Sequence, residues 1–422
     1  DMLWWSEPLW VSNAEDVYAA RYKWYKETLD AAYETYGLKF QYVSATQNER
    51  AADNEWIKYL SEHLKSETEC PYDYSSIKIV AGEEVCSWNS ADAMLADEEL
   101  LNAVDVVGSH YTSWSTDNAR KLAKEYGKEL WFSEASSSMV YAQGTYKYDG
   151  NGSGMNDLNG VLDIANRFIT MYPGGLMTLC EYQPVVSAYY DGAQYTHKQF
   201  ISATDPWSGY FFLDSGFFMK LHFSQFIKKG WAFVDDACYG DGKAGGDGHA
   251  LVDATYSYMT ATDTVTGDYS TVITNTTDKP IVYSITVQNL DKANSQVYVW
   301  ETRGPDGGEY NENYFKQIDT LAPQSDGDKN SYSVTVKPYS IITLSTLNIG
   351  EKNYSNMTEN DRTVLELPYS DDFEYSDYQN DYISSRGGAP RYTTDQGGAF
   401  EVRNIDGNNV LMQMITPDIK AN

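Results

Sequence analysis

The chain has 422 residues, and its 61 acidic and 31 basic side chains give a formal net charge of −30. A surface this negative repels phosphates and anionic lipids, so nucleic acids and membrane surfaces are not expected as partners. No run of about 18 apolar residues occurs, which argues against a membrane-spanning helix, and the length predicts two or three domains.

The first half of the chain alternates between helical and strand-like patterns. Asn13, Asp53 and Thr116 can each cap the start of a helix with periodic apolar residues. Strands are expected at residues 40–46, 77–81, 104–109, 130–133 and 176–181. These runs are apolar throughout, which is typical of a parallel sheet covered on both faces.

Repeated strand-helix units of this size favour an α/β barrel. A (β/α)8 TIM barrel needs eight units, so we interpret the five strands as strands 4–8 and expect three more ahead of Asp1. A doubly wound sheet is the alternative, but no glycine-rich phosphate loop follows any of the strands.

Two glutamates follow strands of this series. Glu49 lies just after residues 40–46, and Glu134 directly follows residues 130–133. A barrel brings the carboxyl ends of its strands together, and glycoside hydrolysis requires two carboxylates that face each other. We therefore predict Glu49 as the acid/base, with Asn48 beside it for the 2-hydroxyl of a sugar, and Glu134 as the nucleophile. The alternatives are a solvated loop glutamate for the first and a buried salt bridge for the second.

Aromatic and histidine side chains stand near the same strand ends. His110 and Tyr111 end the strand between the two glutamates, where either could hydrogen-bond the nucleophile or a sugar hydroxyl, although a structural histidine is equally compatible. Trp5 and Trp10 precede the first helix, in a loop where a tryptophan could stack on a galactose-like ring or pack against the loop.

Beyond residue 229 the pattern changes to alternating, β-branched runs, which predict a β-sandwich. We divide the chain into a partial barrel at 1–229, a β-sandwich at 230–348, a polar linker at 349–368 and the start of a third β domain at 369–422. The four cysteines, Cys70, Cys86, Cys180 and Cys238, show no CxxC spacing, so we expect free thiols and no metal site.

At these residues the chain resembles the galactocerebrosidase family, glycoside hydrolase family 59. The similar blocks are residues 5–10 (WSEPLW), 48–50 (NER), 104–111 (VDVVGSHY), 130–134 (LWFSE), 206–210 (PWSGY), 315–319 (FKQID) and 371–373 (DDF). The resemblance implies a TIM barrel, a β-sandwich and a C-terminal lectin-like domain. It also implies retaining hydrolysis of terminal β-galactosides, with galactosylceramide as the animal substrate.

The resemblance also assigns roles to individual residues. It makes Glu49 the acid/base, Glu134 the nucleophile and Asn48 a sugar contact, and it places Trp5 on the galactose. It matches Tyr195 to a substrate-contacting tyrosine. It also aligns Tyr182 with the strand that carries an active-site tryptophan in the family. It requires no cofactor and allows a calcium ion in the lectin-like domain.

Several expectations concern the protein around this chain. The chain would lack the first barrel strands and most of the lectin-like domain, and a signal peptide in the missing part would make the protein secreted or extracytoplasmic. The rival functions are a non-catalytic carbohydrate-binding protein and a retaining glycosidase of other sugar specificity.

Overall fold

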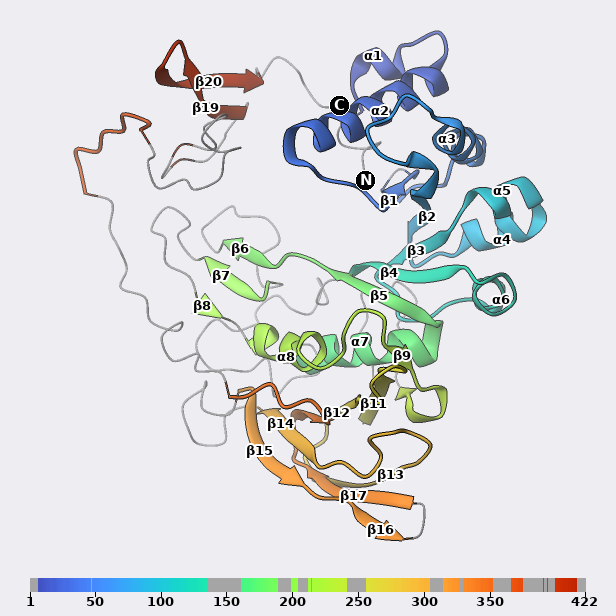
Figure 1. Ribbon diagram of the computed structural model, residues 1–422, viewed down its shortest axis with the longest axis vertical. Helices are drawn as coiled ribbons and strands as arrows, with labels where there is room; N and C mark the ends of the chain where they lie inside the picture. The colour runs from blue at the N-terminus through green and yellow to red at the C-terminus, as the bar shows by residue number, and fades with distance from the viewer. Residues whose placement is uncertain are drawn as a thin grey trace.

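The computed structural model describes residues 7–46, 48–135, 161–188, 199–203, 212–213, 215–240, 256–303, 314–326, 329–351, 366–374, 390, 393 and 399–415 (Figure 1). Within these residues, no helix is both long and apolar enough to cross a membrane.

The first half of the chain forms a parallel sheet of five strands in the order β1-β2-β3-β4-β5. The strands are β1 (Tyr42–Ser44), β2 (Lys78–Val85), β3 (Val106–His110), β4 (Glu129–Ala135) and β5 (Met177–Tyr182). The helices around them are α1 (Leu9–Ser12), α2 (Val17–Tyr36), α3 (Asn54–Ser66), α4 (Asn89–Ala96), α5 (Glu98–Ala103), α6 (Asp117–Tyr126) and α7 (Val161–Gly175). All five strands coincide with runs expected from the sequence.

Several helices begin at a residue whose side chain caps the first turn. Asp53 accepts from the amide of Trp56 at the start of α3, and Thr116 caps α6, as predicted. The prediction that Asn13 caps the first long helix is wrong. Asp16 caps α2, because the chain makes a separate short turn, α1, before that helix begins.

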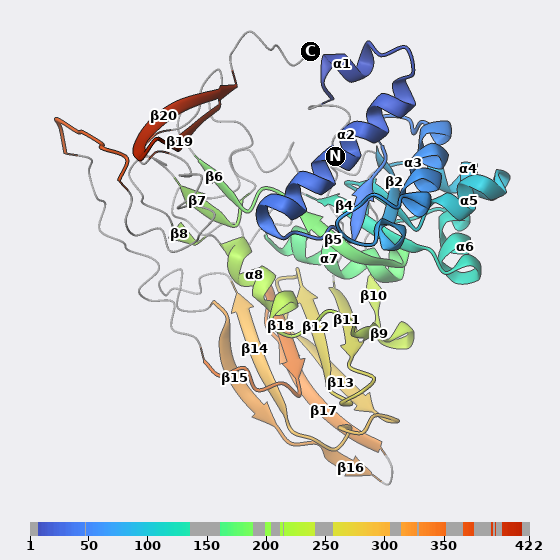
Figure 2. The same cartoon turned by 45° about the horizontal axis from the view of Figure 1, so that its top comes forward.

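The sheet is apolar on both faces. On one face, helices α2 to α6 cover the strands (Figure 2) with fully buried side chains such as Trp56 and Leu60. On the other face, Val80, Val106 and Trp131 form a smaller buried cluster. Burial on both faces explains why these strands read as continuous apolar runs.

Antiparallel sheets make up most of the second half. One has the order β10-β11-β12-β18-β14-β15, with β9 beside β11, and another has the order β13-β17-β16. Their strands are β9 (Ala232–Phe233), β10 (Tyr239–Gly240), β11 (Tyr256–Thr262), β12 (Tyr269–Asn275), β13 (Ile281–Val287), β14 (Val297–Arg303), β15 (Lys316–Leu321), β16 (Gln324–Asp326), β17 (Lys329–Val336) and β18 (Ser340–Ser345). A core that includes Ile273, Val299 and Val336 joins the two sheets.

Short strands complete the described part of the chain. β6 (Val186–Ala188), β7 (Ile201–Ala203) and β8 (Phe212–Leu213) form one small sheet, and β19 (Ala399–Ile405) pairs with β20 (Asn408–Ile415).

Helices α7 and α8 (Ser215–Ser224) lie between the parallel sheet and the large antiparallel sheet (Figure 1). Asn166 on α7 accepts hydrogen bonds from the hydroxyls of Ser257 and Thr274, both at 2.5 Å. On α8, the two ring nitrogens of the fully buried His222 lie 2.8 Å from the hydroxyl oxygens of Thr343 and Thr302. These buried polar contacts fix how the antiparallel strands sit against the helices that support the parallel sheet.

Candidate active site

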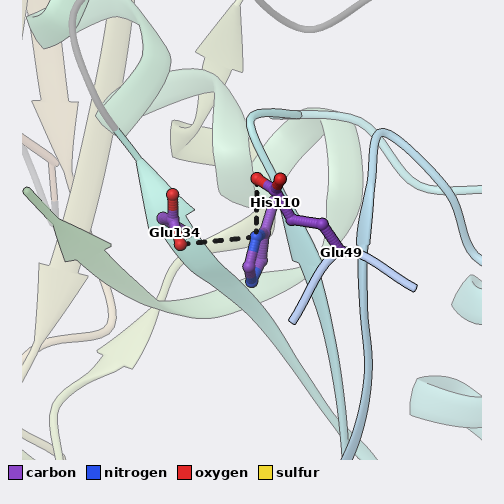
Figure 3. Close-up of side chains that lie close together, drawn as sticks. All are labelled: Glu49, His110 and Glu134. Atoms are coloured by element: carbon purple, nitrogen blue, oxygen red, sulfur yellow. Dashed lines mark ion pairs between the residues drawn. The ribbon is translucent and has the colours of Figure 1, made fainter. Parts of the chain in front are cut away.

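The predicted carboxylate pair meets at the carboxyl edge of the parallel sheet. Glu134 lies on β4, His110 is the last residue of β3, and Glu49 stands in the turn that follows β1. Figure 3 shows both glutamate side chains reaching toward the imidazole of His110. Parallel strands bring their carboxyl ends to one edge, so residues far apart in sequence converge there.

The three side chains are close together. Nδ1 of His110 lies 3.6 Å from Oε1 of Glu49 and 3.4 Å from Oε2 of Glu134. These distances are longer than those of good hydrogen bonds. The atoms of the three side chains that face one another all lie within 4.8 Å.

The other oxygen of Glu134 is held by two donors. The hydroxyl of Tyr111 donates to Oε1 of Glu134, and Nε2 of Gln183 donates to the same oxygen at 2.6 Å. The amide of Tyr111 also donates to the Glu134 carbonyl at 2.8 Å. With Oε1 fixed in this way, Oε2 is turned toward His110 and Glu49.

Burial favours the neutral form of the His110 imidazole. Its residue surface is 2% exposed, and this burial lowers the pKa of His110 below its ordinary value, while the nearby charges of Glu83 and Glu49 oppose the shift without reversing it. An uncharged ring between two carboxylates can offer either a donor or an acceptor, according to its tautomer.

The two carboxylates differ in their access to solvent. The side chain of Glu49 is 37% exposed, whereas that of Glu134 is 21% exposed. The more open group is better placed to exchange protons with water, and the more enclosed one is better held in a single orientation.

The remaining predicted contacts have varied positions. Asn48 is half-buried in the same turn as Glu49. Trp5 and Tyr195 lie outside the described residues. Trp10 is 48% exposed on α1, with the ammonium of Lys23 5.9 Å from its ring centre.

Tyr182 packs against two aromatic side chains. Its ring stacks on Phe200 with centroids 4.2 Å apart, and it meets Phe168 of α7 edge to face at 6.0 Å. Its role as a substrate contact stays a prediction. The next residue, Gln183, reaches Glu134 instead.

Sequence reasoning missed Gln183 and Glu83. Gln183 comes immediately after β5, so the strand-end rule that identified Glu49 could have found it. Glu83 was missed because the second strand was expected to end at residue 81, whereas β2 continues to Val85.

The same three side chains are also the group that could hold a metal ion within the described part of the chain. The ligand atoms would be one oxygen from each of Glu49 and Glu134 and one ring nitrogen of His110. A bound ion would therefore occupy the space between the two carboxylates.

Comparisons with known proteins point to one family. The sequence profile of glycosyl hydrolase family 59 matches residues 1–225. The galactocerebrosidase of Canis lupus familiaris is 28% identical over 365 residues, which cover 84% of this chain and 48% of that protein. The galactocerebrosidase of Homo sapiens is 28% identical over 84% of this chain and 47% of its own length. The chain thus spans about half the length of the curated relatives it matches.

Solved structures share the fold at low sequence identity. A GH30 endoxylanase from Clostridium papyrosolvens C71 has a TM-score of 0.51 and 16% identity, covering 77% of this chain and 71% of that one. A conserved exported protein from Bacteroides fragilis has a TM-score of 0.52 and 14% identity, covering 77% of this chain and 69% of that one.

Proposed function

Because the chain belongs to glycosyl hydrolase family 59, we propose that it cleaves terminal β-galactosides with retention of configuration, using Glu134 as nucleophile and Glu49 as acid/base. The distance between the two carboxylates carries this proposal. One oxygen of Glu49 and one oxygen of Glu134 lie within 4.8 Å of each other, which supports the short carboxyl separation of about 5–5.5 Å in retaining glycosidases over the 6.5–9.5 Å or so of inverting ones.

In the first step, Oε2 of Glu134 attacks the anomeric carbon. The bond to the leaving oxygen breaks, Glu49 gives its proton to that oxygen, and a glycosyl ester of Glu134 forms. Tyr111 and Gln183 support this step because they hold Oε1 and leave Oε2 facing the second carboxylate.

In the second step, Glu49 acts as a base. It takes a proton from a water molecule, the water oxygen attacks the anomeric carbon, and Glu134 leaves as a carboxylate. Glu49 then carries its proton again. The greater exposure of the Glu49 side chain supports this step, because the water must reach it from solvent.

His110 would orient both glutamates. Its Nδ1 lies almost equally far from the two carboxylates, and contacts that are long in a free enzyme shorten when substrate closes the site. As a neutral ring it adds no charge between the nucleophile and the acid/base.

The substrate proposal comes from the relatives. Both curated relatives described above are galactocerebrosidases, so we propose that the substrate is a β-galactoside. Our candidate is a galactosylated lipid, in which the lipid is the leaving group. Asn48, Trp5 and Tyr195 are proposed as sugar contacts. A chain with a net charge of −30 suits a neutral sugar better than an anionic one.

The architecture follows the same proposal. We propose that the five-stranded sheet is strands 4–8 of a (β/α)8 barrel at 1–229, that 230–348 form a β-sandwich, and that 369–422 begin a lectin-like domain after the linker. The fold-level likeness to the endoxylanase supports a barrel. We also propose that the whole protein acts outside the cytoplasm.

Covalent trapping tests the proposal. The full-length protein is treated with an activated 2-deoxy-2-fluoro-β-galactoside, its intact mass is measured, and the labelled peptide is mapped. We expect a gain of one fluorosugar on Glu134, abolished in Glu134→Gln. A label on another carboxylate would refute the nucleophile assignment. An unlabelled, folded protein that cleaves other aryl glycosides would refute galactose, and one that binds sugars without cleaving any would support a binding role.

A further inference from the structure

A third glutamate lies beside the pair, at a break in strand pairing. Gly82 of β2 pairs with Gly108 of β3, and Glu84 pairs with Ser109, so Glu83 between them has no partner on β3. Its φ angle of 53° lies in the left-handed region, which an ordinary side chain seldom adopts. At this bulge the carboxylate of Glu83 reaches Ser44 on β1.

Glu83 holds the segment that carries Glu49 at both ends. Its carbonyl accepts a hydrogen bond from the amide of Glu49 at 3.0 Å. Its carboxylate oxygen Oε2 accepts from the hydroxyls of Ser44 and of Thr46, the latter at 3.3 Å. Main chain and side chain of one residue thus fix the start and the end of the turn after β1.

Two glycines allow the strands to approach closely at this bulge. A Cβ on Gly108 would lie only 2.4 Å from Oγ of Ser133, and at 3.4 Å it would be in van der Waals contact with Cγ of Glu83. A Cβ on Gly82, whose φ is 98°, would lie 2.5 Å from the Gly108 carbonyl. Larger residues at either position would push the strands apart beside Glu83.

We propose that Glu83 is a positioning residue for Glu49, which keeps the acid/base at protonating distance from the leaving group; this inference rests on the proposed function of Glu49. Glu49 itself has a φ of 57° in a partly exposed turn, so its place depends on what anchors that turn. A misplacement of about 1 Å at a reacting group can cost up to about 100-fold in rate.

The test compares substrates with different need for an acid. Aryl β-galactosides with poor leaving groups require protonation by Glu49, whereas a dinitrophenyl galactoside leaves without it. In the full-length protein, Glu83→Ala should lower kcat/KM by about 10- to 100-fold for poor leaving groups and change the dinitrophenyl substrate by no more than about 3-fold. Glu83→Gln should restore much of the loss, because its amide oxygen can still accept from Ser44 and Thr46.

Glu84 offers a matched control. It is the adjacent glutamate on β2, and its carboxylate accepts instead from Nδ2 of Asn89 at 2.8 Å, at the start of α4. Glu84→Ala should show the leaving-group dependence of the unmodified protein. If Glu83→Ala does not fold, the double variant Ser44→Ala/Thr46→Val removes the same hydrogen bonds from the other side and should reproduce the selective loss.

The outcomes separate the two claims. The positioning role alone would be overturned if the unmodified protein cleaves galactosides and Glu83→Ala, or the double variant, loses the same factor in rate on every substrate. An unmodified protein that cleaves no β-glycoside would overturn the proposed function, and the role of Glu83 with it. Selective loss on poor leaving groups, with rescue by Glu83→Gln, would establish both.

Discussion

Tyr111 donates two hydrogen bonds to Glu134. Its hydroxyl donates to the carboxylate and its amide donates to the carbonyl of the same residue at 2.8 Å. The backbone of Tyr111 has a φ of 57° just after β3. In this conformation Tyr111 contacts both the side-chain carboxylate and the main-chain carbonyl of Glu134 on β4. The carboxylate of Glu134 is thus held by the residue that follows the neighbouring strand.

Tyr111→Phe should slow every galactoside substrate to a similar degree. A hydrogen bond to a charged group contributes about 1.5–3 kcal/mol, which corresponds to a loss of about 10- to 100-fold in kcat. The proposed nucleophile, Glu134, is needed whatever the leaving group, so this pattern differs from that expected for Glu83→Ala. Steady-state kinetics measure it, and Tyr126→Phe, at a tyrosine 45% exposed at the end of α6, is the control. An unchanged kcat would refute the orienting role.

Gln183→Leu should also lower kcat, and its effect should depend on Tyr111. Both donors bind Oε1 of Glu134, so removing either one leaves the other to hold it. We expect the double variant to lose more than the product of the two single losses, with a coupling of about 0.5–3 kcal/mol. A double-mutant cycle on kcat measures this. Strictly multiplicative losses would mean that the two donors act separately.

Removing the charge of Glu83 should lower the pKa of His110 further. Burial already lowers that pKa, and the negative charges of Glu83 and Glu49 work against it by favouring the imidazolium. Glu83→Gln removes one of these charges, so the ring should accept a proton only at lower pH. Imidazole NMR titration of the unmodified protein and the variant measures the shift. A pKa that rises in Glu83→Gln would contradict the placement of that carboxylate.

The strand-end glutamates were predictable because parallel strands impose a common edge. Once residues 40–46, 104–109 and 130–133 are recognised as neighbouring strands, Glu49, His110 and Glu134 must lie near one another. This conclusion needs only strand order and direction, which apolar runs separated by helices provide.

Glu83 and Gln183 depend on features that strand periodicity does not encode. The bulge at Glu83 requires close approach between Gly82 on one strand and Gly108 on the next, which is a property of the assembled sheet. At β5 the family resemblance indicated Tyr182, which packs against Phe168 and Phe200, whereas the polar side chain that follows it donates to Glu134.

Acid should weaken the protein through His222. Burial lowers the pKa of His222 to about 3, against an ordinary value of about 6.5 in the unfolded chain. Below about pH 6.5 the unfolded chain therefore binds a proton at His222 that the folded chain does not bind. The stabilisation that comes from keeping His222 neutral is fully present above that pH and is lost as pH falls toward 3. One such group makes the free energy of unfolding fall by up to about 1.4 kcal/mol per pH unit.

His222→Asn should flatten this dependence. The variant loses contacts to Thr302 and Thr343 and should be less stable by about 1–3 kcal/mol at neutral pH. Its unfolding free energy should nevertheless fall less steeply between about pH 6 and pH 4, because the group that takes up the proton on unfolding is gone. Urea unfolding over that range measures the slope, with His63→Asn, at a half-buried histidine on α3, as the control. Equal slopes in the unmodified protein and His222→Asn would show that His222 is protonated in the fold, and that its contacts to the two threonines are not those of a neutral ring.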